Sequence, residues 1–157
     1  MIKWTDFTGI TVSSLIYHTE KGFLFWHRTD QCRDERRKRD NRGGGLKFWE
    51  KITDGMKREL EEEFGRTFRD DQIHRIWYRE QFREHEGKQT HRIGFYHITI
   101  LDGTETITNM EPHKHDELKY FPINYLPTKE ESHSMLYPTL TEFKEKIEIL
   151  IGKKIML

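Results

Sequence analysis

Short apolar segments separated by polar turns mark the first part of the chain. The segments ITVSSLIYH, residues 10–18, and FLFWHR, residues 23–28, are rich in β-branched and aromatic residues that favour strands. Residues 20–22, Glu-Lys-Gly, lie between them and have the composition of a turn. This order of strand, short turn and strand predicts a β-hairpin.

The middle of the chain predicts a second, longer hairpin. Residues 73–84 and 89–101 contain many strand-favouring residues, and residues 86–88, Glu-Gly-Lys, form a turn between them. The alternation of apolar and polar positions is imperfect in both segments, but their residue types favour strands. The segment LKYFPI, residues 118–123, predicts a further strand.

Two segments show helical spacing instead. The first is expected to run from about Thr53 to Phe64 and to end at Gly65. Thr53 or Asp54 would cap its N-terminus. Its apolar stripe consists of Met56, Leu60 and Phe64. A second helix is expected at residues 137–151. Its apolar face consists of Leu140, Phe143, Ile147, Leu150 and Ile151.

The order of these elements predicts the fold class. Three consecutive glycines, Gly43-Gly44-Gly45, are unfavourable inside a helix or strand and therefore predict a tight turn. Strands outnumber helices and do not alternate with them, as they would in a doubly wound sheet. We therefore expect an α+β fold, with a mixed sheet between helices. No internal repeat or linker interrupts the chain, so residues 1–157 are expected to form a single domain.

Composition and charge exclude several classes of protein. Lys plus Arg and Asp plus Glu both total 27, and this balance argues against a general nucleic-acid binder. Aromatic residues make up 13% of the chain, which argues against disorder. No apolar run approaches the roughly 18 residues of a membrane helix. Residues 1–9, MIKWTDFTG, lack the apolar stretch of a signal peptide.

The single cysteine, Cys32, excludes an internal disulfide and a cysteine-based zinc site. With no apparent membrane helix, signal peptide or internal disulfide, the sequence fits a cytoplasmic protein by default. Cys32 lies in a charged segment and is expected to be a free surface thiol rather than a catalytic one. That segment, residues 29–42, contains six basic and four acidic residues. It is interpreted either as a solvated loop or as a loop that attracts phosphate.

Three glutamates gather on one face of the first helix. Glu59, Glu62 and Glu63 are spaced at i, i+3 and i+4, where each like-charge pair costs roughly 0.2–0.5 kcal/mol. A divalent cation reverses the sign of that interaction, because Mg²⁺ and Mn²⁺ prefer hard oxygen ligands. Three acidic residues on a helix, taken alone, would more often form a solvated face than a metal site. Glu61 points to nearly the opposite side and is expected to be dispensable.

Residues around the glutamates extend the candidate site. A backbone carbonyl of the glycine run could supply a further metal ligand. Glu50 precedes the helix and Arg58 lies on it, so an ion pair between them would pin the turn to the helix.

The complete spacing from Gly44 to Gly65 resembles the signature of the Nudix hydrolases, the Nudix box. The strongly specified positions are Gly44, five residues, Glu50, seven residues, Arg58-Glu59-Leu60, one residue, Glu62-Glu63, one residue and Gly65. Arg66 departs from the pattern, since an aliphatic residue usually follows the last glycine. The hairpins, the late acidic loop and the C-terminal helix also follow the order of a whole Nudix domain.

The run CRDERRKRDNRGGGLKFWE, residues 32–50, is similar to a bacterial Nudix subgroup with a segment like CRDE…WD…GGGLEFGE. Arg39 stands where that subgroup usually has Trp, and Trp49 stands where it has Gly. Lys47 replaces a common acidic residue. These departures affect the shape and charge of the substrate pocket and leave the metal-binding pattern intact.

The resemblance implies a Nudix-type α/β/α sandwich that hydrolyses a nucleoside diphosphate linked to another group. Such enzymes use Mg²⁺ or Mn²⁺, and water attacks a phosphorus of the diphosphate. Glu59, Glu62 and Glu63 would then be metal ligands and catalytic residues, with the carbonyl of Gly43 or Gly44 as a further ligand. One of these glutamates, or a carboxylate outside the helix, would take the proton from the attacking water.

A later loop in the family often adds one more carboxylate. The candidates here are Glu111, Asp116 and Glu117, and we retain Glu111 as the metal ligand and Glu117 as a substrate-binding residue. His113 and His115 would either polarise a phosphate or be bystanders. Candidates for holding phosphates are Arg28, Arg33, Arg42 and Arg58. Candidates for stacking on a base are Trp26, Trp49 and Tyr96, of which Trp49 lies beside the glycines.

Two alternatives to this enzyme remain open from the sequence. One is a Nudix-fold module that binds a nucleotide without turnover, although its box would usually be degenerate. The other is a hydrolase of a non-nucleotide diphosphate, such as an isoprenoid or inositol compound. In each case the expected partner is a small nucleotide or diphosphate, with no nucleic acid and no membrane, and the chain would be a monomer or a homodimer.

Overall fold

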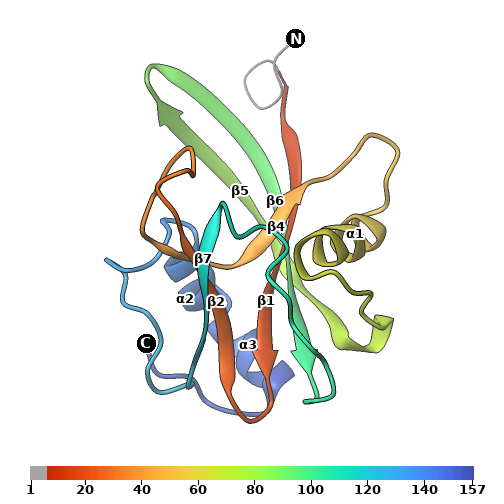
Figure 1. Cartoon of the computed structure of the whole chain (residues 1–157). Helices are drawn as coiled ribbons and strands as arrows, with labels where there is room; N and C mark the ends of the chain where they lie inside the picture. Colours follow the sequence, from red (N-terminus) through yellow and green to blue (C-terminus); the bar gives the residue numbers. More distant parts are fainter. Residues whose placement is uncertain (1–6) are drawn as a thin grey trace.

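A single mixed sheet organises the molecule (Figure 1). A computed structural model of the chain describes residues 7–157, and within them seven strands form this sheet. β1 (Gly9–His18) lies at the centre and pairs in parallel with β6 (Lys88–Leu101). β5 (Ile73–His85) then pairs antiparallel with β6. The expected mixed sheet is therefore confirmed.

The other edge of β1 is shared by two strands. β2 (Gly22–Arg28) pairs with the C-terminal part of β1, and β4 (Arg42–Gly45) pairs with its N-terminal part. β2 in turn pairs with β3 (Arg39–Asp40) and with β7 (His115–Phe121). This division leaves the end of β4 beside the centre of the sheet, where the candidate site lies.

Helices cover both faces of the sheet (Figure 1). α1 (Ile52–Phe64) packs on one face, while α2 (Leu136–Glu142) and α3 (Lys144–Ile151) pack on the other. A short 3₁₀ turn, Asp70–Gln72, precedes β5. Successive side chains of β2 alternate between the two resulting cores, as the pleat of a strand requires. The predicted α+β sandwich is confirmed.

Both predicted hairpins are present. The β5–β6 turn has positive φ at Glu86 (51°) and Gly87 (73°), the backbone of a type I′ turn that matches strand twist. The β1–β2 turn ends at Gly22, whose φ is 91°. β7 begins at His115, three residues before the predicted strand start at Leu118.

The start of α1 differs from its prediction. The helix begins at Ile52, its N-cap residue is Lys51, and no side chain caps it. The prediction that Thr53 or Asp54 is the cap was therefore wrong. Both residues lie in the first turn, where the negative charge of Asp54 favours the helix N-terminus. Gly65 ends the helix in the left-handed conformation, as predicted.

The glycine run is part of a strand and does not form the predicted tight turn. Gly43, Gly44 and Gly45 belong to β4 and pair with β1. A Cβ on Gly43 would lie 2.2 Å from the carbonyl oxygen of Val12, so only glycine lets the two strands approach this closely. The segment 29–42, expected as a loop, likewise contains β3 and the first residue of β4.

The predicted C-terminal helix is divided in two. The division falls at Phe143, whose φ of −100° and ψ of 13° interrupt the helix between α2 and α3. Phe143 remains buried, with its ring 5.5 Å from that of Tyr96, and the apolar face packs on the sheet as expected. No helix among the described residues is long and apolar enough to cross a bilayer. Residues 1–6 of the segment expected to lack a signal peptide lie outside the described residues.

The close approach of β4 to β1 gives a prediction about stability. Replacing Gly43 with Ala is expected to lower the free energy of unfolding by about 1–3 kcal/mol, because the new Cβ meets the fixed backbone of β1. The same change at Gly44 is expected to cost less, because its Cβ meets only the flexible carboxylate of Glu59. Urea unfolding measures the free energy of unfolding of both variants. An equal decrease in the two variants would contradict the prediction.

Candidate functional site

A polar cavity of about 390 Å³ lies between α1, β4 and the loop before β7. Five carboxylates line it, and they are Asp40 and the four glutamates Glu59, Glu62, Glu63 and Glu111. Gly43, Gly44 and Gly45 of β4 also line it. We call this cavity, with its four glutamates and three glycines, the carboxylate cradle. The helix face and the glycine run singled out in the sequence thus meet in one place.

The helix glutamates differ in their access to solvent. Glu63 is 5% exposed, whereas the side chain of Glu62 is 56% exposed. Glu59 is largely buried against β4, and a Cβ on Gly44 would lie 2.2 Å from its Oε2. Glycine at this position therefore lets a carboxylate lie directly against the strand backbone. Glu61 is exposed and does not line the cavity, in agreement with its expected position.

Arg58 links the loop before α1 to the helix. Its Nε and Nη2 donate to the two oxygens of Glu50 at 2.7 and 2.9 Å, so the predicted ion pair is confirmed. Its Nη2 also donates to the carbonyl of Gly45 at 3.2 Å. The hydrogen bonds that Arg58 donates lower the pKa of Glu50 to about 2, and the same bonds raise the pKa of Arg58.

The same guanidinium supplies counter-charge to the glutamate cluster. Nη1 of Arg58 donates to Glu59 at 2.6 Å and to Glu62 at 3.3 Å. These bonds turn both carboxylates towards the arginine. Within residues 7–157, no three acidic, histidine or cysteine side chains already converge as a coordination shell. Binding a cation in the cradle would therefore require these carboxylates to turn towards one another.

The three candidate carboxylates of the later loop, Glu111, Asp116 and Glu117, lie in different places in the structure. Only Glu111 lines the cradle, where Lys114 contacts it at 2.5 Å. Asp116 instead binds His27 at 2.7 Å, and Glu117 binds Arg39 on β3. The hydrogen bond from His27 lowers the pKa of Asp116, so that carboxylate is committed elsewhere. This placement favours Glu111 and does not support Glu117 as a substrate contact.

The candidate phosphate and base contacts have different positions. Arg28 lines the cradle and is held by Asp34 at 2.9 Å and Asp40 at 3.0 Å. Trp26 is buried in the core and cannot stack on a base. Arg33 is exposed, and the side chain of Arg42 lies outside the described part of the structure.

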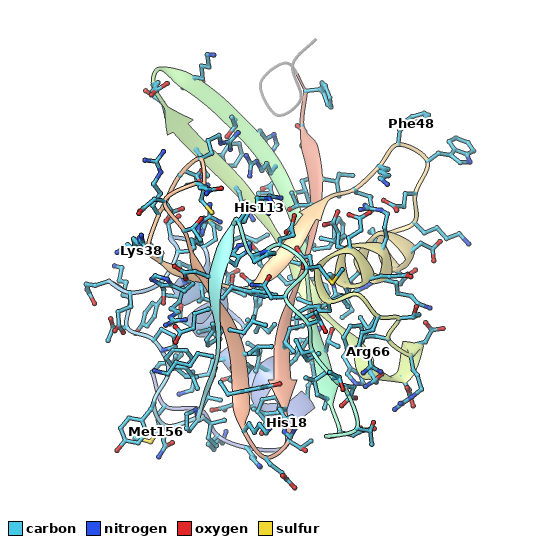
Figure 2. The ribbon with its side chains drawn as sticks, in the orientation of Figure 1. His18, Lys38, Phe48, Arg66, His113 and Met156 are labelled. Atoms are coloured by element: carbon cyan, nitrogen blue, oxygen red, sulfur yellow. The ribbon has the colours of Figure 1, made fainter. Side chains whose placement is uncertain are left out.

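Trp49 is exposed, as expected, but it does not reach the cradle. Trp49 is 92% exposed and has a φ of 65°. It lines neither the cradle nor a second cavity, described below, on the other side of β4. The adjacent Phe48 points away from the body of the molecule (Figure 2). A flanking contact between Trp49 and a substrate is not favoured by this position.

Cys32 corrects another expectation, because it is buried rather than at the surface. Its Sγ donates to the carbonyl of Lys114 at 3.2 Å, so it ties the segment 29–42 to the loop before β7. The two histidines of that loop differ. His113 is exposed, whereas His115 is buried, lines the cradle and packs against Trp26.

A second cavity of about 290 Å³ lies against β4 and shares residues with the cradle. The shared wall is Arg28, Asp40, Asn41 and the three glycines. The rest includes Gln81 and Arg83 from β5 and Arg92 and Tyr96 from β6. Tyr96 is thus at this cavity, with its hydroxyl bound by Gln81 at 2.7 Å. Sequence analysis missed Asp40, Gln81, Arg83 and Arg92, although alternate spacing along a strand places such pairs on one face.

Glu35 holds the rim of the second cavity together. Its carboxylate accepts hydrogen bonds from Arg83 on β5 at 2.9 Å and from the Ser134 hydroxyl at 2.8 Å. His133 Nε2 lies 2.7 Å away. Burial opposes ionisation of Glu35, but the bonds from His133 and Ser134 outweigh it and lower its pKa to about 2. Burial also disfavours protonation of His133, but Glu35 and Asp40 outweigh it and raise its pKa.

The raised pKa of His133 gives a prediction about pH dependence. Its stabilising contribution is fully present below the unfolded-state pKa of about 6.5 and is lost as the pH rises through the raised folded-state pKa. The free energy of unfolding of the wild type should therefore fall as the pH increases above about 6.5. Urea unfolding of His133→Gln should lack that step, whereas His113→Gln should retain it. An unchanged step in His133→Gln would contradict the assignment.

Comparisons with known proteins agree with the predicted fold and with the predicted family. The family model described as NUDIX domain matches residues 8–140. None of the curated proteins compared matches the chain. A MutT NUDIX hydrolase from Burkholderia pseudomallei superimposes with a TM-score of 0.71 at 17% identity, covering 86% of this chain and 97% of that one.

Two further solved structures have the same fold. A C. elegans Ap4A hydrolase matches with a TM-score of 0.60 at 14% identity, over 90% of this chain and 99% of that one. A bifunctional NMN adenylyltransferase/ADP ribose pyrophosphatase from Francisella tularensis, complexed with AMP and a manganese ion, matches with a TM-score of 0.63 at 16% identity. That match covers 88% of this chain and 42% of the other. Because the family model spans most of the chain, the chain belongs to the NUDIX domain family, and this membership supports the expected pyrophosphohydrolase activity.

Proposed function

We propose that the chain hydrolyses a nucleoside diphosphate linked to a further group, with a divalent metal and with water attacking a phosphorus of the diphosphate. The observation that carries this proposal is the meeting of Glu59, Glu63 and Glu111 with the glycine strand in one cavity. A solvated acidic helix face would not require a buried Glu63, nor a Glu59 packed directly against Gly44. A site for a cation explains both features.

The donor set fits a hard divalent cation. It contains only carboxylate and carbonyl oxygens, which suit Mg²⁺ or Mn²⁺. The residues that would hold the ion are Glu59, Glu62, Glu63, Glu111 and the carbonyl of Gly43 or Gly44. When bound, the ion would neutralise the diphosphate and lower the pKa of a bound water. The manganese ion in the Francisella structure, described for that protein, supports the same choice.

The chain's own residues would position the diphosphate and move the proton. Arg28 and Lys114 are the cations on the cradle wall, and both could contact phosphate oxygens. Arg58 is committed to Glu50, so its role is to fix the loop before α1 rather than to bind phosphate. One cradle carboxylate would take the proton from the attacking water, and that role stays open among the four glutamates.

Two of the similar structures support a nucleotide as substrate. One is an ADP ribose pyrophosphatase and the other an Ap4A hydrolase, and both names refer to adenine nucleotides. Cytoplasmic location and a monomeric or homodimeric state stay predictions. Turnover distinguishes the proposed enzyme from a binding module, and the substrate panel below distinguishes nucleotides from other diphosphates.

The proposal predicts metal-dependent turnover that depends on two cradle glutamates. A panel of nucleotides and non-nucleotide diphosphates, assayed for release of phosphate or pyrophosphate, should show hydrolysis only with Mg²⁺ or Mn²⁺. The double variant Glu62→Gln, Glu63→Gln should lose on the order of 100-fold or more in kcat, because it removes two metal-ligand charges.

Glu61→Gln is the matched control, since Glu61 lies on the same helix but outside the cavity. It should retain full activity and stability. Full activity in the double variant would reject the mechanism. Nucleotide binding without product, with either metal, would instead support the binding module.

A further inference from the structure

A third cavity, of about 360 Å³, lies between α1 and the sheet. Its lining includes Thr53 and Lys57 of α1, Ile73 and Arg75 of β5, and His97 of β6. It shares no lining residue with the cradle or with the second cavity. A ligand of this cavity is therefore held by residues that the proposed hydrolysis does not use.

His97 presents a buried imidazole to this cavity. The residue is 2% exposed, and its register partner is Arg75, so both side chains lie on the sheet face that α1 covers. Nδ1 of the ring lies 3.3 Å from the carbonyl oxygen of Ser13 on β1. A carbonyl oxygen only accepts hydrogen bonds, so Nδ1 carries the proton. Because β1 and β5 flank β6 on opposite sides, the other edge of the ring faces the β5 side, where the cavity lies.

The second ring nitrogen of His97, Nε2, is a hydrogen-bond acceptor. Burial lowers the pKa of His97 and the charge of Arg75 lowers it further, although the backbone of Ser13 and Phe95 opposes this shift. The neutral ring keeps a lone pair on Nε2. This atom is buried, and within residues 7–157 it has no hydrogen-bond partner. A buried acceptor without a partner is unfavourable, and a ligand that donates a hydrogen bond removes that cost.

The charges around His97 balance one another. Two carboxylates, Asp54 and Asp70, and two cations, Lys57 and Arg75, line the cavity. Nζ of Lys57 lies 2.6 Å from Asp70, while Asp54 and Arg75 are exposed at the rim. A polyphosphate would meet the carboxylates here, and a simple cation would meet the lysine and the arginine. The balance favours an uncharged ligand that both donates and accepts hydrogen bonds.

An uncharged nitrogen heterocycle has this combination of groups. The edge of a nucleobase carries N–H donors beside carbonyl or ring-nitrogen acceptors, and carboxylates and arginines are their usual protein partners. Ile73 adds an apolar contact for a flat ring. A volume of about 360 Å³ lies within the range of small-molecule sites, so the cavity has room for a base with its sugar.

We propose that the third cavity binds an uncharged heterocycle of the nucleobase type, with an N–H group that donates to Nε2 of His97. Arg75 and Asp54 contact its remaining polar atoms at the rim. The ligand lies apart from the cradle and is bound without being hydrolysed. This inference does not depend on the proposed function, because the two sites share no residue.

Nucleosides test the cavity without catalysis, because they carry no phosphate for a metal to hold. Adenosine, guanosine, cytidine and uridine are titrated into the ¹⁵N-labelled wild type in EDTA, and the imidazole nitrogens are followed by NMR. The two resonances that His97→Phe lacks belong to His97, and the unprotonated one is Nε2. At least one nucleoside should shift that resonance until it saturates. No shift with any of the four nucleosides would overturn the inference.

Calorimetry of two variants then locates the bound nucleoside. Thr53→Trp fills the cavity from its exposed rim, and His97→Phe keeps a ring but removes both nitrogens. Each should weaken binding of that nucleoside about tenfold or more. Glu61→Trp is the matched control, because it adds the same indole to an exposed position of α1 outside the cavity, and it should bind as the wild type does. Binding of wild-type strength in both Thr53→Trp and His97→Phe would overturn the inference.

This inference and the proposed function fail separately. Metal-dependent hydrolysis of the panel without nucleoside binding contradicts the third cavity and leaves the proposed function intact. Nucleoside binding that depends on His97, with no hydrolysis of the panel by either metal, contradicts the proposed function. Thermal unfolding of each variant confirms that it is folded.

Discussion

The close approach of β4 to its neighbours is the constraint on which the site depends. Gly43 lies against the backbone of Val12, and Gly44 lies against the carboxylate of Glu59. A side chain at Gly43 would push the strand away from β1, and a side chain at Gly44 would displace the carboxylate of Glu59 from the strand. This contact brings the helix glutamates to the strand backbone, and the same backbone lines both the carboxylate cradle and the second cavity.

The glutamate cluster is tolerated because a stronger local interaction outweighs its repulsion. Each like-charge pair on the helix costs roughly 0.2–0.5 kcal/mol. A hydrogen bond to a charged group contributes about 1.5–3 kcal/mol, and Arg58 makes two with Glu50 while also contacting Glu59. The arginine within the box therefore stabilises the acidic helix face before any metal binds. Its position between Glu50 and the glutamates links the loop before α1 to the cradle.

Features that depend on local spacing were predicted from the sequence. The two hairpins, the apolar stripe of α1, the helix end at Gly65 and the Glu50–Arg58 pair all follow from residues close in the chain. Features that depend on contacts between residues far apart in the chain were not predicted. The glycine strand pairs with β1 some thirty residues away, and Cys32 is buried by the loop before β7. The second cavity requires β4 and β6 to pair with the two edges of β1, and no local pattern fixes those pairings.

Trp49 illustrates how a departure from similar sequences can be structural in origin. The backbone N–H of Glu50 donates to the carbonyl of Lys47, which closes a turn with Trp49 at its third position. That position has positive φ in a type II turn and favours glycine, the residue found in the similar bacterial segment. A non-glycine residue there costs of order 1–3 kcal/mol, and it persists only where surrounding contacts fix the backbone.

Those contacts come from Glu50, whose carboxylate accepts both the Lys47 N–H and the Arg58 guanidinium. The turn is thus held by the same anchor that supports the cradle, while the indole itself points to solvent. The positive φ of Trp49 is therefore tied to the loop before α1 and not to a contact made by its side chain. The side chains of β5 and β6 meet the glycine strand elsewhere, in the second cavity on the far side of β4 from the cradle.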